Sequence, residues 1–104
     1  MIVVPNSQGS IGVDYDFAVA ECPASAPYVV GGYAVSAPPA GAITASGPYD
    51  FTAGAPINGT NTFTPFTGAQ VPGDIYGWVM TIPQGSQSTA ANGGMSVYAV
   101  CTAA

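Results

Sequence analysis

The amino-acid sequence predicts an all-β protein, a single antiparallel β-sandwich or flattened barrel that carries an extended N-terminal arm. Short apolar runs alternate with turn residues along the chain, which is typical of sandwiches and barrels. The 14 Gly and 10 Pro recur too often for a long helix, so we expect almost no helix. A length of 104 residues fits one domain, and 48% hydrophobic residues are enough for one core.

Residues 1–14 are expected to form the arm, and residues 15–104 the sandwich domain. Pro5 and Gly9 argue against a compact helix in the arm, which is too short to build a core of its own. An extended apolar segment of this kind can add a strand to the sheet edge of a neighbouring molecule. The predicted assembly contacts are Ile2, Val3, Val4, Ile11 and Val13.

The strands of the sandwich follow from alternation and from flanking turn residues. Strong strands are predicted at 15–22, 28–35, 76–82 and 95–101, and weaker ones at 42–46, 49–53 and 61–67. The strong strands should supply most of the core, from Phe17, Val19, Val29, Tyr33, Trp78, Val79 or Met80, Ile82 and Val97. The pair Gly31-Gly32 predicts a bulge or a close backbone approach, and Asn58-Gly59 predicts a tight turn rather than a glycosylated sequon.

Charge is the most restrictive property of the composition. The chain has no Lys, Arg or His and 5 acidic residues, with a formal net charge of −5. Without an imidazole, ammonium or guanidinium group, Ser and Thr lack a base and phosphate lacks a cationic partner. We therefore expect no enzyme, no cofactor, no nucleic-acid partner and no binding to anionic membranes.

The acidic residues offer few arrangements for chemistry. Asp14 and Asp16 would share a strand face and could bind Ca²⁺, but the Asp-rich loop of calcium sites is missing, so two exposed carboxylates are the favoured interpretation. No spacing among the acids selects a pair for glycoside hydrolysis. No metal site is therefore predicted.

The 2 cysteines, Cys22 and Cys101, lie near the two ends of the chain. Two thiols without His cannot complete a zinc site, and the Cys-x-x-Cys redox spacing is absent. Two free core thiols are one interpretation. A disulfide between an early strand and the last one is favoured, and closing a loop of about 80 residues would contribute roughly 4.5 kcal/mol in the chain-entropy model. A disulfide would imply an oxidising final location.

Five short motifs lie along the chain: Glu21-Cys22-Pro23-Ala24, Tyr28-Val29-Val30-Gly31-Gly32-Tyr33, Ser36-Ala37-Pro38, Gly77-Trp78-Val79 and Val97-Tyr98-Ala99-Val100-Cys101. Together they resemble a small β-sandwich module of secreted and phage-encoded proteins from high-GC Gram-positive bacteria. The resemblance covers about 22–35 and 77–101, departs from the pattern at Ser25-Ala26-Pro27, and leaves 40–75 uncovered. It implies an all-β fold with a Cys22–Cys101 bridge and transfers no catalytic residue.

Aromatic side chains in the irregular middle of the chain are the predicted contacts for a partner or a glycan. They are Tyr49, Phe51, Phe63 and Phe66, which we expect to be exposed.

Two functions from different classes fit these observations. The first is a virion surface protein of a phage, either a capsid decoration or cement protein or a tail-associated one, that forms a homo-oligomer such as a trimer. A charge-poor surface loses little when a neighbouring subunit buries it. The second is a secreted module that binds a glycan or a protein at a bacterial cell surface. The apolar start of the chain has no basic region before it and ends at Pro5, too early for a signal peptide. Either a signal precedes this sequence, or the protein is made in a cytoplasm and is released as part of a particle.

Overall fold

The computed structural model describes every residue except 6–7, 11–13, 37–41, 61–62, 84–94 and 104. The described residues form strands and no helix, as the sequence predicts. The strands are β1 (Ile2–Pro5), β2 (Gln8–Ser10), β3 (Tyr15–Glu21), β4 (Tyr28–Ser36), β5 (Ala45–Asp50), β6 (Tyr76–Pro83) and β7 (Met95–Thr102). The described part of the chain contains no helix that is long and apolar enough to cross a membrane.

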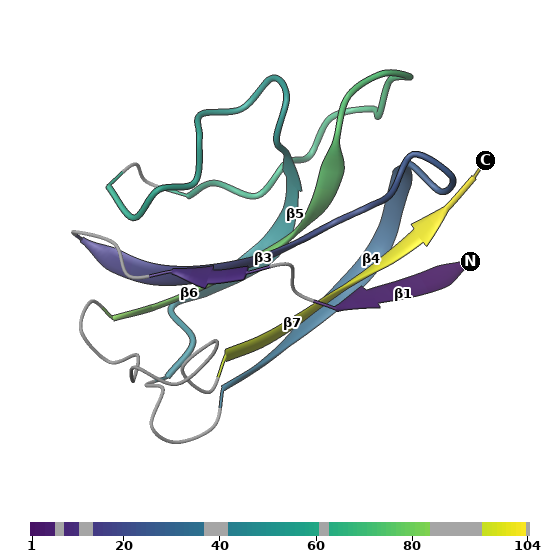
Figure 1. Ribbon diagram of the computed structural model, residues 1–104. Helices are drawn as coiled ribbons and strands as arrows, with labels where there is room; N and C mark the ends of the chain where they lie inside the picture. The colour runs from purple at the N-terminus through teal and green to yellow at the C-terminus, as the bar shows by residue number, and fades with distance from the viewer. Residues whose placement is uncertain (6–7, 11–13, 37–41, 61–62, 84–94, 104) are drawn as a thin grey trace.

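Two antiparallel sheets pack face to face as a sandwich (Figure 1). One sheet has three strands in the order β1-β7-β4, and the other has four in the order β2-β3-β6-β5. Strand β7 stacks on β3, and β4 stacks on β6 and β5. The first and last strands of the chain are neighbours in the three-stranded sheet, so the two termini lie close together.

The first residues of the chain belong to the sheets, which differs from the expectation of a separate arm. Ile2 pairs with Cys101 and Pro5 with Tyr98, so β1 is an edge strand beside β7. Strand β2 pairs with β3 at the edge of the other sheet. The apolar residues of β1 pack within their own chain, because β1 pairs with the edge of β7 that β4 does not occupy. A deletion of residues 1–13 would therefore remove two strands of the sandwich.

The four strong strands are confirmed to within a residue at each end, but the middle of the chain differs from its prediction. One strand, β5, takes part of the ranges 42–46 and 49–53. The described residues of 61–67 form no strand. Turn and bend residues replace regular structure from Phe51 to Gly59, where Gly59 has a φ of 83°. Asn58 accepts hydrogen bonds from the backbone and side chain of Thr60, which confirms a tight turn.

The main core lies between the two sheets. It contains Ala18, Ala20, Val29, Tyr76, Met80, Ile82, Met95, Val97 and Ala99, together with both cysteines. A second apolar cluster lies on the other face of the four-stranded sheet and contains Phe17, Val19, Tyr49, Phe63 and Val79. All of the predicted core residues are buried except Tyr33, which is exposed, and Trp78, which is half-buried against the main core.

The disulfide between Cys22 and Cys101 is confirmed, with Cα atoms 5.8 Å apart. Cys22 directly follows β3 and Cys101 lies in β7, so the bond joins the two sheets across the core. Its sequence separation of 79 residues links the first core strand to the last. A buried disulfide of this kind indicates an extracellular or otherwise oxidising location.

Candidate interaction surface

The outward side of the three-stranded sheet is the most distinctive surface of the molecule, and we call it the outer face. In β7, Met95, Val97, Ala99 and Cys101 point into the core, so the residues between them point outward. The register of β7 with β1 and β4 then assigns the other outward positions. The outer face consists of Val3, Pro5, Tyr28, Gly31, Tyr33, Val35, Ser96, Tyr98, Val100 and Thr102.

Large apolar and aromatic groups dominate this face. Val3, Tyr33 and Val35 are 56%, 49% and 51% exposed. The rings of Tyr33 and Tyr98 stack on each other with centroids 4.6 Å apart. Stacking of this kind fixes two large side chains in place before any partner arrives, which lowers the entropy cost of contact.

The bulge in β4 explains why this surface carries Tyr33. Register with β7 shifts between Val29 and Gly31, which confirms the bulge predicted at the glycine pair. One extra residue reverses the alternation, so Val29 and Ala34 point inward while Tyr33 points outward. The expectation that Tyr33 lies in the core is wrong for this reason.

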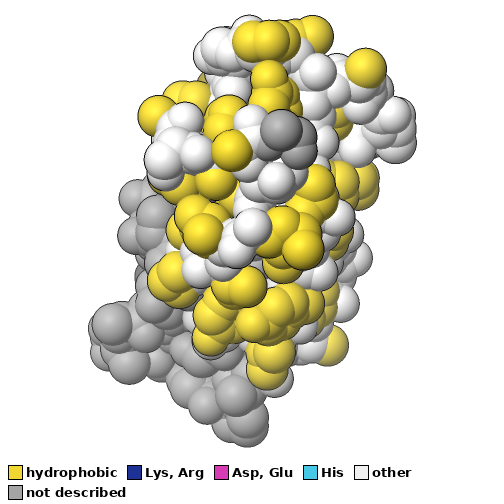
Figure 2. Space-filling model, turned by 90° about the vertical axis from the view of Figure 1, so that its right-hand side faces the viewer, with side chains coloured by type: hydrophobic (Ala, Val, Ile, Leu, Met, Phe, Trp, Pro, Cys, Tyr) yellow, Lys and Arg dark blue, Asp and Glu magenta, His cyan; other side chains and the backbone are white. Residues whose placement is uncertain are grey.

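The outer face is also free of charged side chains. All 5 acidic residues belong to strands of the other sheet or to the segments that border them. Asp14, Asp16 and Glu21 lie at or in β3, Asp50 ends β5, and Asp74 precedes β6. Figure 2 views the molecule from the side on which β1, β7 and β4 lie in Figure 1, and it shows clustered hydrophobic side chains and no Asp or Glu.

The corresponding side of the four-stranded sheet is covered by the chain itself. Phe17, Val19 and Val79 point outward from β3 and β6, and Tyr49 and Phe63 pack over them. Phe51 and Ile57 add to this cover from the connection between β5 and β6, which Figure 1 shows arching above the sheet. One sheet thus has its second apolar face buried, whereas the described residues leave the outer face of the other sheet open.

The same packing corrects the prediction for the aromatic middle of the chain. Tyr49 and Phe63 are buried rather than exposed, and the Tyr49 hydroxyl donates to the Ala55 carbonyl at 2.6 Å. Phe51 and Phe66 are half-buried and pack against the two apolar clusters. These four rings cover the four-stranded sheet and fill the side of the sandwich, because their sheet offers a large apolar face close in sequence.

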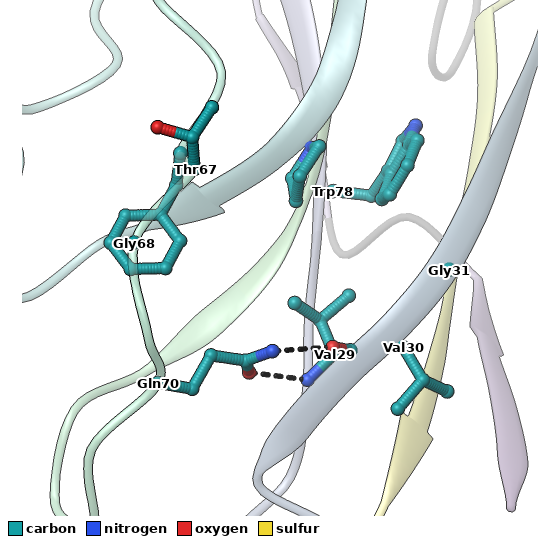
Figure 3. Close-up of a pocket in the computed structure, with 9 residues that line it drawn as sticks. Val29, Val30, Gly31, Thr67, Gly68, Gln70 and Trp78 are labelled. Atoms are coloured by element: carbon teal, nitrogen blue, oxygen red, sulfur yellow. Dashed lines mark hydrogen bonds between the residues drawn. The ribbon is translucent and has the colours of Figure 1, made fainter.

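The free edge of β4 is closed near its start by a side chain. The backbone N–H of Val29 donates to Gln70 Oε1 at 2.8 Å, and Gln70 Nε2 donates to the Val29 carbonyl at 2.6 Å (Figure 3). The Gln70 amide thereby takes the place that a neighbouring strand would occupy. At the other sheet edge, Phe66 N–H donates to the Pro48 carbonyl of β5 at 2.7 Å. The segment between these residues bridges the edges of both sheets.

A groove of about 330 Å³ lies beneath this segment, between β4 and β5. Trp78, Phe66 and Pro48 provide apolar walls, and Gln70 and Thr67 provide polar groups. The Trp78 indole rests against Gly32, where an added Cβ would lie 2.5 Å from two of the ring carbons. Its N–H donates to Ser46 Oγ at 2.9 Å. Trp78 therefore closes the sandwich on this side and presents only part of its ring to the groove.

The acidic residues form no metal site within the described part of the chain. Asp14 is exposed, but Asp16 is fully buried, so the favoured interpretation of two exposed carboxylates is wrong for Asp16. The side chains of Asp50 and Asp74 hydrogen-bond to each other. This bond is the main reason why the Asp74 pKa is raised.

The Asp50 pKa reflects opposing effects. Burial acts to raise it, but hydrogen bonds from the Ala53 N–H, from Asp74 and from the Thr52 N–H hold the pKa below its ordinary value. The Asp50 carboxylate thus orders the turn after β5, with Oδ1 accepting at 2.9 Å from Ala53 and at 3.0 Å from Thr52. Its role in the described structure is that of a turn cap.

The predicted assembly contacts of the arm divide into two groups. Ile2, Val3 and Val4 lie in β1, where Val3 belongs to the outer face and Val4 packs against the main core. Ile11 and Val13 lie outside the described residues. The outer face as a whole was not predicted, although the sequence holds its signal: the second face of 95–101 carries Tyr98 and Val100, so both faces of this strand are apolar.

Comparisons of the chain with protein-family models, with curated proteins and with solved structures found no match. The fold and the disulfide implied by the resemblance to phage and secreted sandwich modules are present. No family is identified by these features alone.

Proposed function

We propose that this protein is a non-enzymatic assembly module that binds its neighbours through the outer face of the β1-β7-β4 sheet. One observation carries the proposal. The chain covers the apolar outside of its four-stranded sheet with its own aromatic side chains but leaves Val3, Tyr33 and Val35 exposed on the other sheet. Contiguous apolar surface on a small domain is typical of a contact with another molecule.

The absence of basic side chains supports the same function. Catalysis by Ser or Thr needs a base, and phosphate or nucleic-acid binding needs cations, but the chain has no Lys, Arg or His. A surface of Tyr, Val, Pro, Ser and Thr is inexpensive to desolvate, because no charge has to leave water. An assembly role needs only uncharged side chains that can be buried against a neighbour, and this composition supplies them.

Within this class we propose a virion surface protein of a phage, a capsid decoration or cement protein or a tail-associated protein. The disulfide suits a particle that persists outside the cell. Many weak contacts through a small apolar face would add up on a particle with repeated sites. The resemblance to phage-encoded sandwich modules points the same way.

The test is co-sedimentation of the chain with phage particles from an induced or infected host culture. The expected result is a stoichiometric band with the particles, lost in Val35→Glu and kept in Val71→Glu. Val71 is the matched control, since it is 48% exposed against 51% for Val35 but lies outside the outer face. A chain that never sediments with particles refutes the virion role.

The groove beside Trp78 favours a second candidate, a secreted module that binds a neutral glycan or a protein at the cell surface. Its lining of aromatic rings, an amide and a hydroxyl without charge suits sugar hydroxyls and C–H faces. Trp78 is the sole Trp, so its fluorescence reports on the groove directly. Saturable change of this fluorescence with cell-wall polysaccharide would favour this candidate, and an unchanged spectrum would reject it.

A further inference from the structure

We infer that the occupant of the outer face is a second copy of this chain, which packs its own outer face against the first across a two-fold axis. This inference rests on the proposed assembly function and names the partner at the same surface. Three properties of the described structure support it, namely charge, sheet edges and shape, and the area of the face sets the expected strength of the contact.

Charge restricts which surfaces of two copies can meet. The chain carries −5 and no basic side chain, so no salt bridge can form between side chains of two copies. Surfaces with Glu21, Asp14 or Asp74 would repel their counterparts. The outer face has no acidic residue and is the one sheet face on which two identical molecules can meet without bringing like charges together.

The edges of the three-stranded sheet are less suited to pairing than its face. Gln70 already satisfies the backbone N–H and carbonyl of Val29 at the β4 edge. The β1 edge has only 4 residues and ends at Pro5, which has no N–H to donate. Short edges, proline and side-chain caps are the usual protection against edge-to-edge pairing. A β1 edge that is short and ends in proline, and a β4 edge that is capped at Val29, favour stacking through the open apolar face over pairing at the edges.

The shape of the face allows such stacking. Twisted sheets pack with their strands within about 30° of each other and with interdigitating side chains. Tyr33 and Tyr98 stand at the same level of β4 and β7, because they are direct partners in the register. A two-fold axis brings the Tyr33–Tyr98 stack of one copy against the same patch of the other, which is the geometry of an isologous interface.

The area of the face predicts a weak and reversible dimer. Strand β7 has 8 residues. Strand β1 adds 4 residues and β4 adds 9, so at ~3.4 Å per residue and ~4.8 Å between strands the face covers a projected area of roughly 340 Å². A standard stable interface buries about 800 Å² per partner, and about 1,000 Å² in total is a lower bound for a specific contact. We expect a dissociation constant on the order of 10–500 µM, given this small area.

The experiment is analytical ultracentrifugation of the full chain, with its disulfide intact, from about 10 µM to 1 mM. The expected result is a monomer–dimer equilibrium that is unchanged or strengthened between low and high NaCl, because salt screens the repulsion between two copies of charge −5. Val35→Glu and Tyr98→Glu should each raise the dissociation constant at least ~100-fold, because each would bury an unpaired carboxylate in an apolar interface.

Val71→Glu is the control, because it adds the same charge at an equally exposed position away from the outer face, and it should change the dissociation constant less than ~3-fold. Near-UV circular dichroism verifies that each variant is folded. A monomer at 1 mM, or a dimer that persists in both outer-face variants, overturns the inference. In the first case, particle binding that still depends on Val35 would show that the proposed function survives with a different partner.

Discussion

Gly32 is the position at which a single added carbon should disturb the packing between the sheets most. In Gly32→Ala, the new Cβ would overlap Trp78 Cδ2 and lie 2.5 Å from Cε3 and Cγ. The indole is rigid, so it must move away from β4 as a unit and give up its 2.9 Å hydrogen bond to Ser46. Overpacking typically costs 1–3 kcal/mol and a hydrogen bond about 0.5–1.5 kcal/mol, so we expect a loss of roughly 2–4 kcal/mol in unfolding free energy.

Gly31→Ala is the matched control in the same strand. A Cβ at Gly31 meets only Val100 Cβ, at an ordinary distance of 3.9 Å, and it points to the outer face. We expect its unfolding free energy to stay the same or to rise by up to about 1 kcal/mol, because alanine restricts the conformations of the unfolded chain. Urea unfolding with the disulfide intact measures both variants. A Gly32→Ala protein within about 0.5 kcal/mol of the wild type would refute the account of the glycine as space for the indole.

Two further predictions concern Gln70 and the pair Asp50 and Asp74. Gln70→Ala should lower the unfolding free energy by about 1–3 kcal/mol in urea titrations, because the partly buried backbone groups of Val29 lose both partners. Gln70→Glu should not restore it at pH 7, since a carboxylate cannot donate to the Val29 carbonyl. Because the Asp74 pKa is raised by folding, this carboxyl stabilises the fold at pH values below its unfolded pKa, and the stabilisation is lost as the pH rises through its folded pKa. Because the Asp50 pKa is lowered by folding, that carboxyl stabilises the fold at pH values above its unfolded pKa, and the stabilisation is lost as the pH falls through its folded pKa. Asp74→Asn donates to Asp50 without ionising, so thermal unfolding should show it more stable than the wild type at pH 7, with the difference vanishing well below pH ~4. A variant that is no more stable at pH 7 would contradict the assignment of the Asp50 hydrogen bond as the main cause of the raised Asp74 pKa.

The strands that alternate cleanly could be predicted from the sequence. In β7, small and apolar side chains at every second position mark the inward face without reference to the rest of the fold. The disulfide could be anticipated because Cys22 and Cys101 lie at the ends of the first and last core strands. The glycine pair also predicts the bulge, but the outward turn of Tyr33 depends on where the register shifts, between Val29 and Gly31, which the pair alone does not specify.

The sequence could not predict that aromatic side chains of the chain cover the outward face of the four-stranded sheet but leave the outer face of the three-stranded sheet open. The residues Phe51 to Phe63 contain too many turn residues to show any period, so their aromatic rings resemble exposed loop residues. Only the fold shows that they lie over Val19 and Val79 and bury a second apolar cluster. The pairing of β1 with β7 depends on contacts between the two ends of the chain, which local patterns do not specify. Both features together determine which apolar face remains open.

Hydroxyl-radical footprinting of the full chain, alone at about 10 µM and within its assembled state, tests most directly whether the outer face is the contact. The account predicts protection of Val3, Tyr33 and Val35 on assembly, with unchanged labelling of Val71 and Ile75. The comparison is balanced, because these five side chains are 48–56% exposed. Protection of Val71 and Ile75 with continued labelling of Tyr33 and Val35 would contradict the assignment of the outer face as the assembly surface.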